Sequence, residues 1–333
     1  MDPFTITIII IFSSTFVAGY LKSTLKDRCM KDFQRFPVIA SMKNGKTIWG
    51  KFLLESTGFF LQYDSPHCNI DHEETGFIIY KPEYQTLSGI FRLVSDLSQE
   101  DRKRRGVKSL VFKQGWLFSI RKCIRNFFAA VRDAITDTFS LFLGKFAMRS
   151  SIISQNQVYM KKVGEGVFDY VGNSYDPVLE RLVGSWVVVE IFRGGKWFEY
   201  PGILRNYTKD FVEVISIRIP LEIDFNIYSD RMESFGFSFD YSGGLLRVRN
   251  ERSEEISVSF DDSEKVVLEP GKDLQMSFDE RPSKGAIVIN EELDAILPRS
   301  EAIVRHTMPG RRIADESDSS VRHDSQWDNR PLG

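Results

Sequence analysis

An uncharged run near the start of the chain constrains this sequence more than any other feature. Nineteen consecutive residues, Pro3 to Leu21, carry no charge, and Lys22, Lys26 and Arg28 follow closely. A run of this length is about long enough to cross the hydrocarbon core of a bilayer as a helix. Because the basic residues lie on its C-terminal side, the positive-inside rule places the N-terminus outside and the bulk of the chain in the cytoplasm. The sequence therefore predicts a single-pass membrane protein.

A cleaved secretory signal and a buried core segment are the alternatives for this run. A signal peptide begins with a basic region and ends at a small-residue cleavage site. Here only Asp2 precedes the run, and residues 17–20 make a poor cleavage site. The three cysteines, Cys29, Cys68 and Cys123, are odd in number and widely spaced, which indicates a reducing compartment. These observations favour a retained anchor.

The net charge of −2 hides a strong asymmetry between the two halves of the chain. Residues 1–162 hold 24 lysines and arginines against 14 acidic residues, a balance of +10. The remaining residues hold 20 against 32, a balance of −12. Anionic lipid attracts basic segments close to a membrane by about 1 kcal/mol per charge. The basic half therefore favours an anionic bilayer leaflet as its partner over nucleic acid, which is the alternative for such a segment.

A long amphipathic pattern from about Trp116 to Phe146 lies in this basic half. Apolar residues recur there at spacings of three and four, and the opposite face is charged, so the segment is not a spanning helix. The pattern is typical of a helix that lies in the headgroup plane, with packing on the β core or on a second copy as alternatives. The predicted membrane-binding residues are Arg104, Arg105, Trp116, Arg121, Lys122, Arg125, Phe127 and Phe128.

Two segments with strand and turn signals look like copies of one another. In the first, two apolar runs flank Asn44-Gly45, the strongest short-range signal for a β-hairpin. In the second, two similar runs flank Gly194-Gly195. Each copy follows a short helical segment, and each contains a glycine, Gly50 or Gly202, where the strand is expected to bend.

The first copy resembles the first sequence motif of the Sm and LSm proteins. The residues that carry the resemblance are Val38-x-Ala40-x-Met42-Lys43-Asn44-Gly45-Lys46-x-Ile48-x-Gly50, and it covers roughly 60 residues in each half. It implies a short helix and five strongly bent strands in a small barrel, with barrels that associate through strand edges. The Asp and Asn that shape the RNA pocket of Sm proteins are missing from residues 55–61, so the resemblance does not imply RNA binding.

Residues 67–74 form the one polar cluster that suggests chemistry. His67, Cys68, Asp71 and His72 are residue types that ligate zinc, and a loop can bring them onto one ion. The alternative is a solvated hairpin loop. The cluster raises a metal-dependent hydrolase as the enzyme-class hypothesis. The sequence contains no nucleophile elbow, phosphate-binding loop or dinucleotide-binding glycine motif, and we expect no cofactor.

The expected fold is therefore mainly β with a membrane helix. The predicted domains are a transmembrane anchor (1–22), a first Sm-like β-barrel (23–98), a basic run with the amphipathic helix (99–150), a second Sm-like β-barrel (151–220), a C-terminal small β-sandwich module (221–305) and a disordered tail (306–333).

The function that these features predict is a non-enzymatic, membrane-anchored scaffold or adaptor. We expect it to associate with itself or with other proteins through its β-barrels at the cytoplasmic face of the membrane. The alternatives are the metal-dependent hydrolase, a nucleic-acid-binding Sm-like protein and a subunit similar to mechanosensitive channels of small conductance. Such channels need several spans and a Gly/Ala-patterned pore helix, whereas residues 3–21 offer one span with a single glycine.

Overall fold

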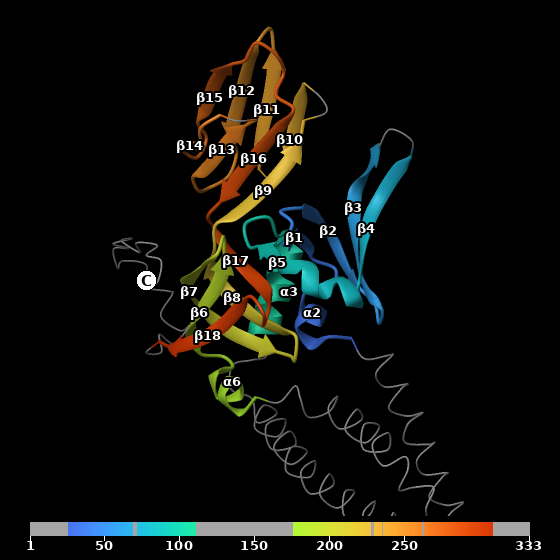
Figure 1. Ribbon diagram of the computed structural model, residues 1–333, viewed down its shortest axis with the longest axis vertical. Helices are drawn as coiled ribbons and strands as arrows, with labels where there is room; N and C mark the ends of the chain where they lie inside the picture. Colours follow the sequence, from blue (N-terminus) through green and yellow to red (C-terminus); the bar gives the residue numbers. More distant parts are fainter. Residues whose placement is uncertain are drawn as a thin grey trace, which may run out of the picture.

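The computed structural model describes residues 26–68, 72–110, 176–227, 230–234, 236–261 and 263–308. Over these residues the chain is mainly β, with four short helices. The strands form one ten-stranded sheet and two four-stranded sheets (Figure 1).

The first half of the described chain contributes three helices and five strands. These elements are α2 (Arg28–Asp32), β1 (Pro37–Met42), β2 (Thr47–Leu54), β3 (Gly58–Cys68), β4 (Glu73–Tyr80), the 3-10 helix η1 (Lys81–Thr86), β5 (Leu87–Leu93) and α3 (Gln99–Leu110). The second half begins with one helix and three long strands: α6 (Pro177–Leu182), β6 (Trp186–Arg193), β7 (Lys196–Tyr207) and β8 (Phe211–Arg218).

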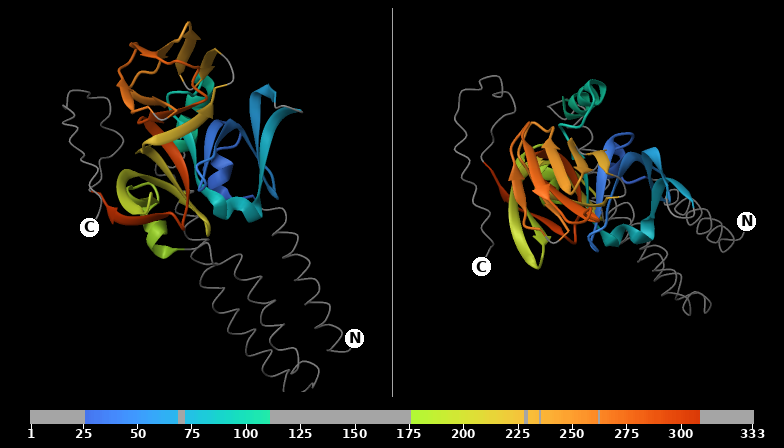
Figure 2. Two further views of the ribbon diagram at one scale, coloured as in Figure 1. Left: turned by 45° about the horizontal axis from the view of Figure 1, so that its top comes forward. Right: turned by 90° about the horizontal axis from the view of Figure 1, so that it is seen from above.

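A β-sandwich follows, and two further strands then return to the large sheet. The sandwich strands are β9 (Leu221–Asn226), β10 (Arg231–Ser234), β11 (Phe237–Ser242), β12 (Leu245–Asn250), β13 (Ile256–Phe260), β14 (Val266–Leu268), β15 (Asp273–Ser277) and β16 (Lys284–Ile289). The returning strands are β17 (Glu292–Pro298) and β18 (Ala302–Thr307). Figure 2 shows the sandwich at one end of the molecule, beyond the ends of β8 and β17.

The ten-stranded sheet joins strands from both halves of the chain. Its order is β18-β6-β7-β8-β17-β5-β1-β2-β3-β4, and the neighbouring strands are antiparallel. The N-terminal set of five strands runs β5-β1-β2-β3-β4, and the C-terminal set runs in the matching order β18-β6-β7-β8-β17. The two sets meet where β17 pairs with β5, so that Asp294 lies opposite Arg92.

Two glycines occupy matching places in these two sets. A Cβ atom on Gly50 of β2 would lie 2.5 Å from the carbonyl oxygen of Gln62, and one on Gly202 of β7 would lie 2.6 Å from the Val214 side chain. No side chain fits at either position, because contacts this short are repulsive. Both sequence-predicted bends therefore fall where a neighbouring strand approaches the backbone closely.

The starts of the helices follow the capping rules. Asp176 accepts hydrogen bonds from the backbone N–H groups of Val178 and Leu179, and Pro177 is the first residue of α6. A proline costs nothing at this position, because the N–H that it lacks has no partner in the helix. The short helical segment expected before the second copy is thereby confirmed as α6.

The shared strands β5 and β17 separate two apolar cores. Phe91 and Ala295 face the larger core, which runs through the C-terminal set into the sandwich. Ile90 and Ile296, next to them in the chain, face the smaller core between α2 and the N-terminal set. Since neighbouring residues of a strand point to opposite faces, the β5–β17 pairing seals both cores at once.

The prediction of two Sm-like β-barrels is wrong. Closure would require β4 to pair with β5 in the first segment, but β5 pairs with β1 and β17, and β4 pairs with β3. The strands that were expected to close two barrels instead extend one open sheet. The segment expected as a separate C-terminal β module (221–305) supplies the sandwich and also β17 and β18 of the large sheet.

The membrane predictions also need correction. Among the residues that the structure describes, no helix combines the length and the apolar character needed to cross a bilayer. The longest of these helices, α3, has 12 residues and begins with a highly charged sequence. The expected anchor over 3–21 and the expected amphipathic helix over 116–146 lie outside the described residues. The single-pass localisation therefore finds no support in the structure, and we do not retain it.

Candidate functional site

One margin of the ten-stranded sheet is the strand β4, on the outer side of the β3–β4 hairpin (Figure 1). Within the described ranges β4 has β3 as its single neighbour. Ile78 and Tyr80 of this strand are 51% and 52% exposed, and no charged residue or proline lies between Glu74 and Lys81. Natural proteins protect sheet margins with charges, prolines or bulges. The unprotected character of β4 makes it a candidate interaction edge.

The backbone of β4 offers hydrogen-bonding groups along this margin. The N–H of Lys81 donates to the carbonyl of Thr57 at 2.9 Å, which fixes the phase of the β3–β4 ladder. In an antiparallel pair, successive residues direct their backbone groups alternately toward the partner and away from it. Gly76 and Ile78 therefore direct their N–H and C=O groups toward the open side of β4.

The opposite margin is β18, which has β6 as its single neighbour among the described strands. The N–H of Phe192 donates to the carbonyl of Glu301 at 2.8 Å, so the same alternation directs the backbone groups of Val304 outward. The end of β18 carries Arg305 and His306, both exposed, and Arg305 also contacts Glu190 at 2.8 Å. The two margins therefore differ in charge, since β4 begins with two glutamates and β18 ends near an arginine.

The margins of the sandwich are better protected. β10 carries Arg231 and Glu233, both exposed, and β15 begins with the exposed Asp273. β14 is three residues long. Charged or very short edge strands resist pairing with another chain, so β4 is the edge most open to a partner strand.

The outer face of the β10–β11–β12–β15 sheet encloses a shallow hollow of about 550 Å³. Its charged lining comprises Arg231, Arg247, Arg249, Glu233, Asp240 and Asp273. Three cations and three anions balance, and they alternate across the strands. Arg231 contacts Asp240 at 2.7 Å, and Arg249 lies 3.9 Å from Asp273. This balance gives the hollow no preference for a ligand of one charge.

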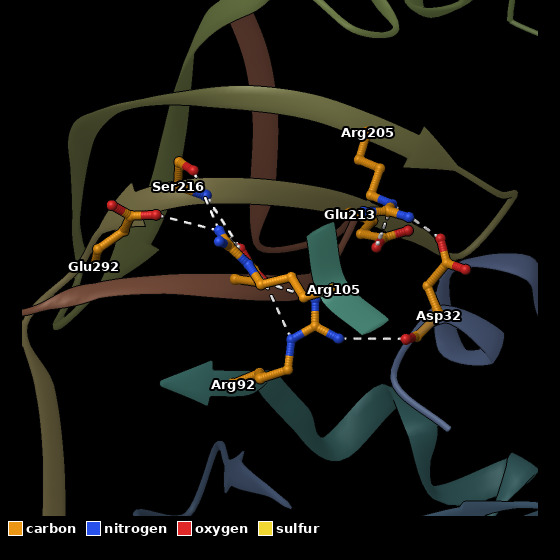
Figure 3. A network of polar contacts seen from close by, with 8 residues as sticks. Asp32, Arg92, Arg105, Arg205, Glu213, Ser216 and Glu292 are labelled. Atoms are coloured by element: carbon orange, nitrogen blue, oxygen red, sulfur yellow. Dashed lines mark hydrogen bonds and ion pairs between the residues drawn. The ribbon is translucent and has the colours of Figure 1, made fainter. Parts of the chain in front are cut away.

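A buried ionic network lies where the two strand sets meet (Figure 3). Asp294 of β17 has no solvent exposure, and both Nε and Nη2 of Arg92 donate to its Oδ2, at 3.0 and 2.6 Å. Arg105 of α3 donates to Oδ2 and Oδ1 of the same carboxylate at 2.8 and 2.9 Å. The network therefore joins β5, β17 and α3 through a single carboxylate.

The electrostatics of Asp294 favour its ionised form. Burial alone would raise the pKa of this carboxyl, but hydrogen bonds from Arg105 and the positive charges of Arg92 and Arg105 outweigh it and hold the pKa below its usual value. The backbone N–H of Ser216 also donates to Asp294 Oδ1 at 3.2 Å. Ser216 lies at the β-bulge between β8 and β17 with a positive φ of 54°, so the carboxylate also compensates a strained turn of the chain.

A second carboxylate, Glu213 of β8, lies in the same region under very different conditions. It has no solvent exposure, and neither of its oxygens has a hydrogen-bond partner among the described residues. Arg205 Nε lies 3.3 Å from Glu213 Oε1 but donates its hydrogen bond to Asp32 Oδ2 at 3.0 Å. Burial, and then the negative charge of Asp32, raise the pKa of Glu213 well above its usual value.

A third ionic group attaches the sandwich to the N-terminal half. Arg252, in the β12–β13 connection, donates to both oxygens of Glu291 at 2.6 and 3.0 Å. It also donates to Asp96 at 2.7 Å and to the Ser95 hydroxyl at 2.7 Å, both after β5. The arginine therefore fixes the sandwich against the segment that leads into α3.

The sequence-predicted membrane-binding residues fall into two groups. Arg104 and Arg105 lie on α3, where Arg104 pairs with Asp101 at 2.8 Å and Arg105 is held by Asp294 as described above. Arg105 also contacts Glu292 at 3.2 Å, so its positive charge is paired with carboxylates of the same chain. The other predicted residues, Trp116, Arg121, Lys122, Arg125, Phe127 and Phe128, lie outside the described residues.

The predicted metal-binding loop lies at the tip of the β3–β4 hairpin. His67 and Cys68 are the end of β3, with no description of their side chains, and Asp71 lies outside the described residues. His72 is exposed, and its Nε2 lies 3.2 Å from Glu74 Oε1. The structure therefore shows one carboxylate beside His72 and leaves the rest of the predicted cluster untested.

The sequence analysis did not single out the members of the buried network. Arg92, Glu213 and Asp294 each interrupt an apolar strand, and a charge in such a place signals a buried partner. The sequence does not identify the partner of each charge, because Arg92 and Asp294, for example, lie 202 residues apart.

Comparisons with protein-family models, with curated proteins and with solved structures find no match to this chain. The function proposed below therefore rests on the two margin strands of the large sheet, β4 and β18, and on the buried ionic network.

Proposed function

We propose that the protein is a non-enzymatic scaffold or adaptor whose copies add to one another head to tail. In this assembly, β4 of one copy pairs antiparallel with β18 of the next. The observation that carries the proposal is the matching order of the two strand sets. Within one chain, β17 ends the C-terminal set and pairs with β5, which begins the N-terminal set. β4 and β18 hold the equivalent places at the two margins, so pairing them between copies repeats the internal junction.

The charges at the two margins support this choice of partner. β4 begins with Glu73 and Glu74, and β18 ends near Arg305. In an antiparallel pair the start of one strand lies beside the end of the other, so the two glutamates of β4 lie beside Arg305 of β18. Opposite charges across a strand pair stabilise it and set its direction.

The symmetry of this contact determines the kind of assembly that it forms. A contact between two different surfaces of the same chain is heterologous, so it generates a ring if the rotation closes and a filament if it does not. Either assembly repeats the sandwich, with its charged outer face, at a fixed spacing. Such an array is suited to holding partner proteins in register.

The buried charges support a non-enzymatic role. Arg105 and Arg92 both contact Asp294 at the junction of the two strand sets, and Arg252 contacts Glu291 between the sandwich and β5. Charged groups engaged in this way fix the arrangement of the strands. The hydrolase hypothesis would require a site at 67–74, where the structure places one carboxylate beside His72.

The test is the mass of the full-length protein in solution, compared with edge-blocked variants. Replacement Ile78→Pro removes an N–H that faces the open side of β4, which an edge strand tolerates. We expect the wild-type mass to rise with concentration above the 38.4 kDa of one chain, and the mass of Ile78→Pro to stay at that value. Ile78→Thr keeps the N–H and is the matched control, which we expect to assemble. Assembly of Ile78→Pro equal to that of the wild type would contradict the proposal.

A mixing experiment tests the head-to-tail geometry. Val304→Pro blocks the other margin, so we expect this variant alone to be monomeric as well. Mixed in equal amounts, Ile78→Pro and Val304→Pro each retain one intact margin, and we expect them to form a dimer that grows no further. Dimers of Val304→Pro alone would instead show that β4 pairs with β4, and would overturn the head-to-tail arrangement. Circular dichroism of both variants confirms that they are folded.

A further inference from the structure

We propose that Glu190, Glu199 and His306 form a binding site for a divalent transition-metal ion of the zinc class. These residues come from three adjacent strands, β6, β7 and β18, of the ten-stranded sheet. One ligand atom from each lies within 4.8 Å of the others. The site is distinct from the sequence-predicted cluster at 67–74 and does not depend on the proposed assembly.

The register of the sheet places the two carboxylates together. Glu190 of β6 and Glu199 of β7 are directly opposite each other, so their side chains share one face. Like charges in this arrangement repel each other and destabilise the strand pair. A cation between them removes that cost, and two carboxylate oxygens are ligands that zinc accepts.

A β-bulge brings the imidazole to the same face. The register between β18 and β6 shifts between Val304 and His306, so that Arg305 is the extra residue and His306 lies opposite Val188. Without the bulge, strand alternation would turn His306 to the opposite face. With it, His306 Nε2 lies 3.7 Å from Glu199 Oε1, too long for a strong hydrogen bond.

The exposure of the three side chains fits the capture of a hydrated ion. The Glu190 side chain is 13% exposed, whereas those of Glu199 and His306 are 41% and 62% exposed. Around a tetrahedral zinc ion, ligands about 2.0–2.2 Å from the metal are roughly 3.4 Å apart. The two exposed side chains therefore need to move by about an ångström, while the less exposed Glu190 stays in place.

The donor set selects the class of metal. One imidazole nitrogen and two carboxylate oxygens suit zinc or cobalt, since calcium takes six to eight oxygens and magnesium keeps most of its waters. A bound ion would join the margin strand β18 to both β6 and β7. Ligand binding to the folded state alone raises its stability by mass action.

Arg305 competes with a metal for one member of the site. Its Nε donates to Glu190 Oε2 at 2.8 Å, so part of the glutamate charge is already compensated. If the cluster were only a set of surface ion pairs, removal of Arg305 would have no effect on metal binding. In a metal site, Arg305→Gln frees Glu190 and is expected to tighten binding several-fold.

The experiment is calorimetric titration of the full-length protein with Zn²⁺, together with its melting temperature in Zn²⁺. We expect His306→Ala and Glu199→Gln each to remove one equivalent of binding, or to weaken it at least tenfold, and to abolish the zinc-dependent rise in melting temperature. His72→Ala is the matched control, because His72 also stands exposed beside a glutamate, and we expect it to keep this equivalent. Unchanged zinc binding in His306→Ala, or no binding by the wild type, would overturn the proposal.

A spectroscopic readout locates the ion on this face of the sheet. Trp197 pairs with Phe192 in the register, two residues from the Glu190–Glu199 pair and on the same face, and their rings lie 5.2 Å apart. Co²⁺ bound at the site is expected to quench the Trp197 fluorescence. The quenching should disappear in Trp197→Phe and in His306→Ala, and it should persist in His72→Ala. Quenching unaffected by His306→Ala would place the ion elsewhere and reject the site.

Discussion

Asp294 and Glu213 are two buried carboxylates on neighbouring strands, and their surroundings shift their pKa values in opposite directions. Asp294 accepts hydrogen bonds from Arg92, Arg105 and the Ser216 backbone, and its pKa is lowered. Glu213 accepts none from the described residues, and its pKa is raised. Both are fully buried, so burial alone does not decide the ionisation of either group.

The difference lies in where the arginines direct their N–H groups. Arg92 and Arg105 direct theirs at Asp294, whereas Arg205 lies between two carboxylates and donates to Asp32. A buried charge is stable only where donors satisfy it, and otherwise the group becomes neutral. Asp294 therefore holds the junction of the two strand sets as an anion, whereas burial and the charge of Asp32 favour the neutral form of Glu213.

Removal of the Asp294 carboxylate is expected to lower the free energy of unfolding the most. Asp294→Ala leaves Arg92 buried without its anion, and loss of one partner of a buried pair costs about 3–5 kcal/mol. Urea unfolding measures this as a loss in the free energy of unfolding. Asp240→Ala is the control, because it breaks an exposed Arg–Asp pair on the sandwich and should cost less than about 1 kcal/mol. Equal losses in the two variants would show that burial of Asp294 adds nothing.

Removal of one of its two arginines should have an intermediate effect. Arg105→Met keeps the aliphatic contacts of α3 and leaves Arg92 on Asp294, so we expect a loss of about 1.5–3 kcal/mol, the range for hydrogen bonds to charged groups. Arg104→Met, one residue away, breaks a more exposed pair with Asp101 and should cost less. A greater loss in Arg104→Met would show that α3 is held by its surface and not by Asp294.

Neutralisation of Glu213 is expected to act in the opposite direction. Its folded-state pKa is raised, so its favourable contribution is complete below the unfolded value of about 4.3 and is lost as the pH rises through the folded value. Glu213→Gln removes the charge with little change in shape. We expect the free energy of unfolding of Glu213→Gln to exceed that of the wild type by an amount that grows as the pH rises above about 4.3. A loss that grows with pH would show that Glu213 is ionised and satisfied.

The smallest effect is the pH dependence of the Asp294 contribution. Its folded-state pKa is lowered, so its stabilisation is present above the unfolded value of about 3.9 and is lost as the pH falls through the folded value. The gap in unfolding free energy between the wild type and Asp294→Asn should therefore shrink on acidification below about pH 4. A constant gap for Asp294→Asn would contradict the lowered pKa.

The local structure of this chain could be predicted from its sequence. The hairpin at Asn44-Gly45 and the short helix before the second copy are confirmed, because turns and helix caps depend on residues close together in the chain. The prediction of closed barrels failed because closure depends on which strand reaches the free side of β5, and that strand is β17.

The charged network lay beyond sequence reasoning for a similar reason. Asp294 and Glu213 look alike in sequence, since each is an acid with apolar residues directly before and after it. What separates them is the direction of arginine side chains that come from distant strands and from α3. The Glu190–Glu199–His306 cluster likewise depends on the cross-strand register and on a bulge at Arg305, neither of which the sequence reveals.

The β5–β17 pairing also has a consequence for folding during synthesis, because the two strands are translated far apart in time. Arg92 is made 202 residues before Asp294. At about 5–20 residues per second, the N-terminal strands wait roughly 10–40 s for the strand that completes their sheet. During that interval the nascent chain presents the apolar flank of β5 as well as that of β4. Unpaired strand edges make folding intermediates prone to aggregation, so β5 adds a second exposed edge until β17 has been translated.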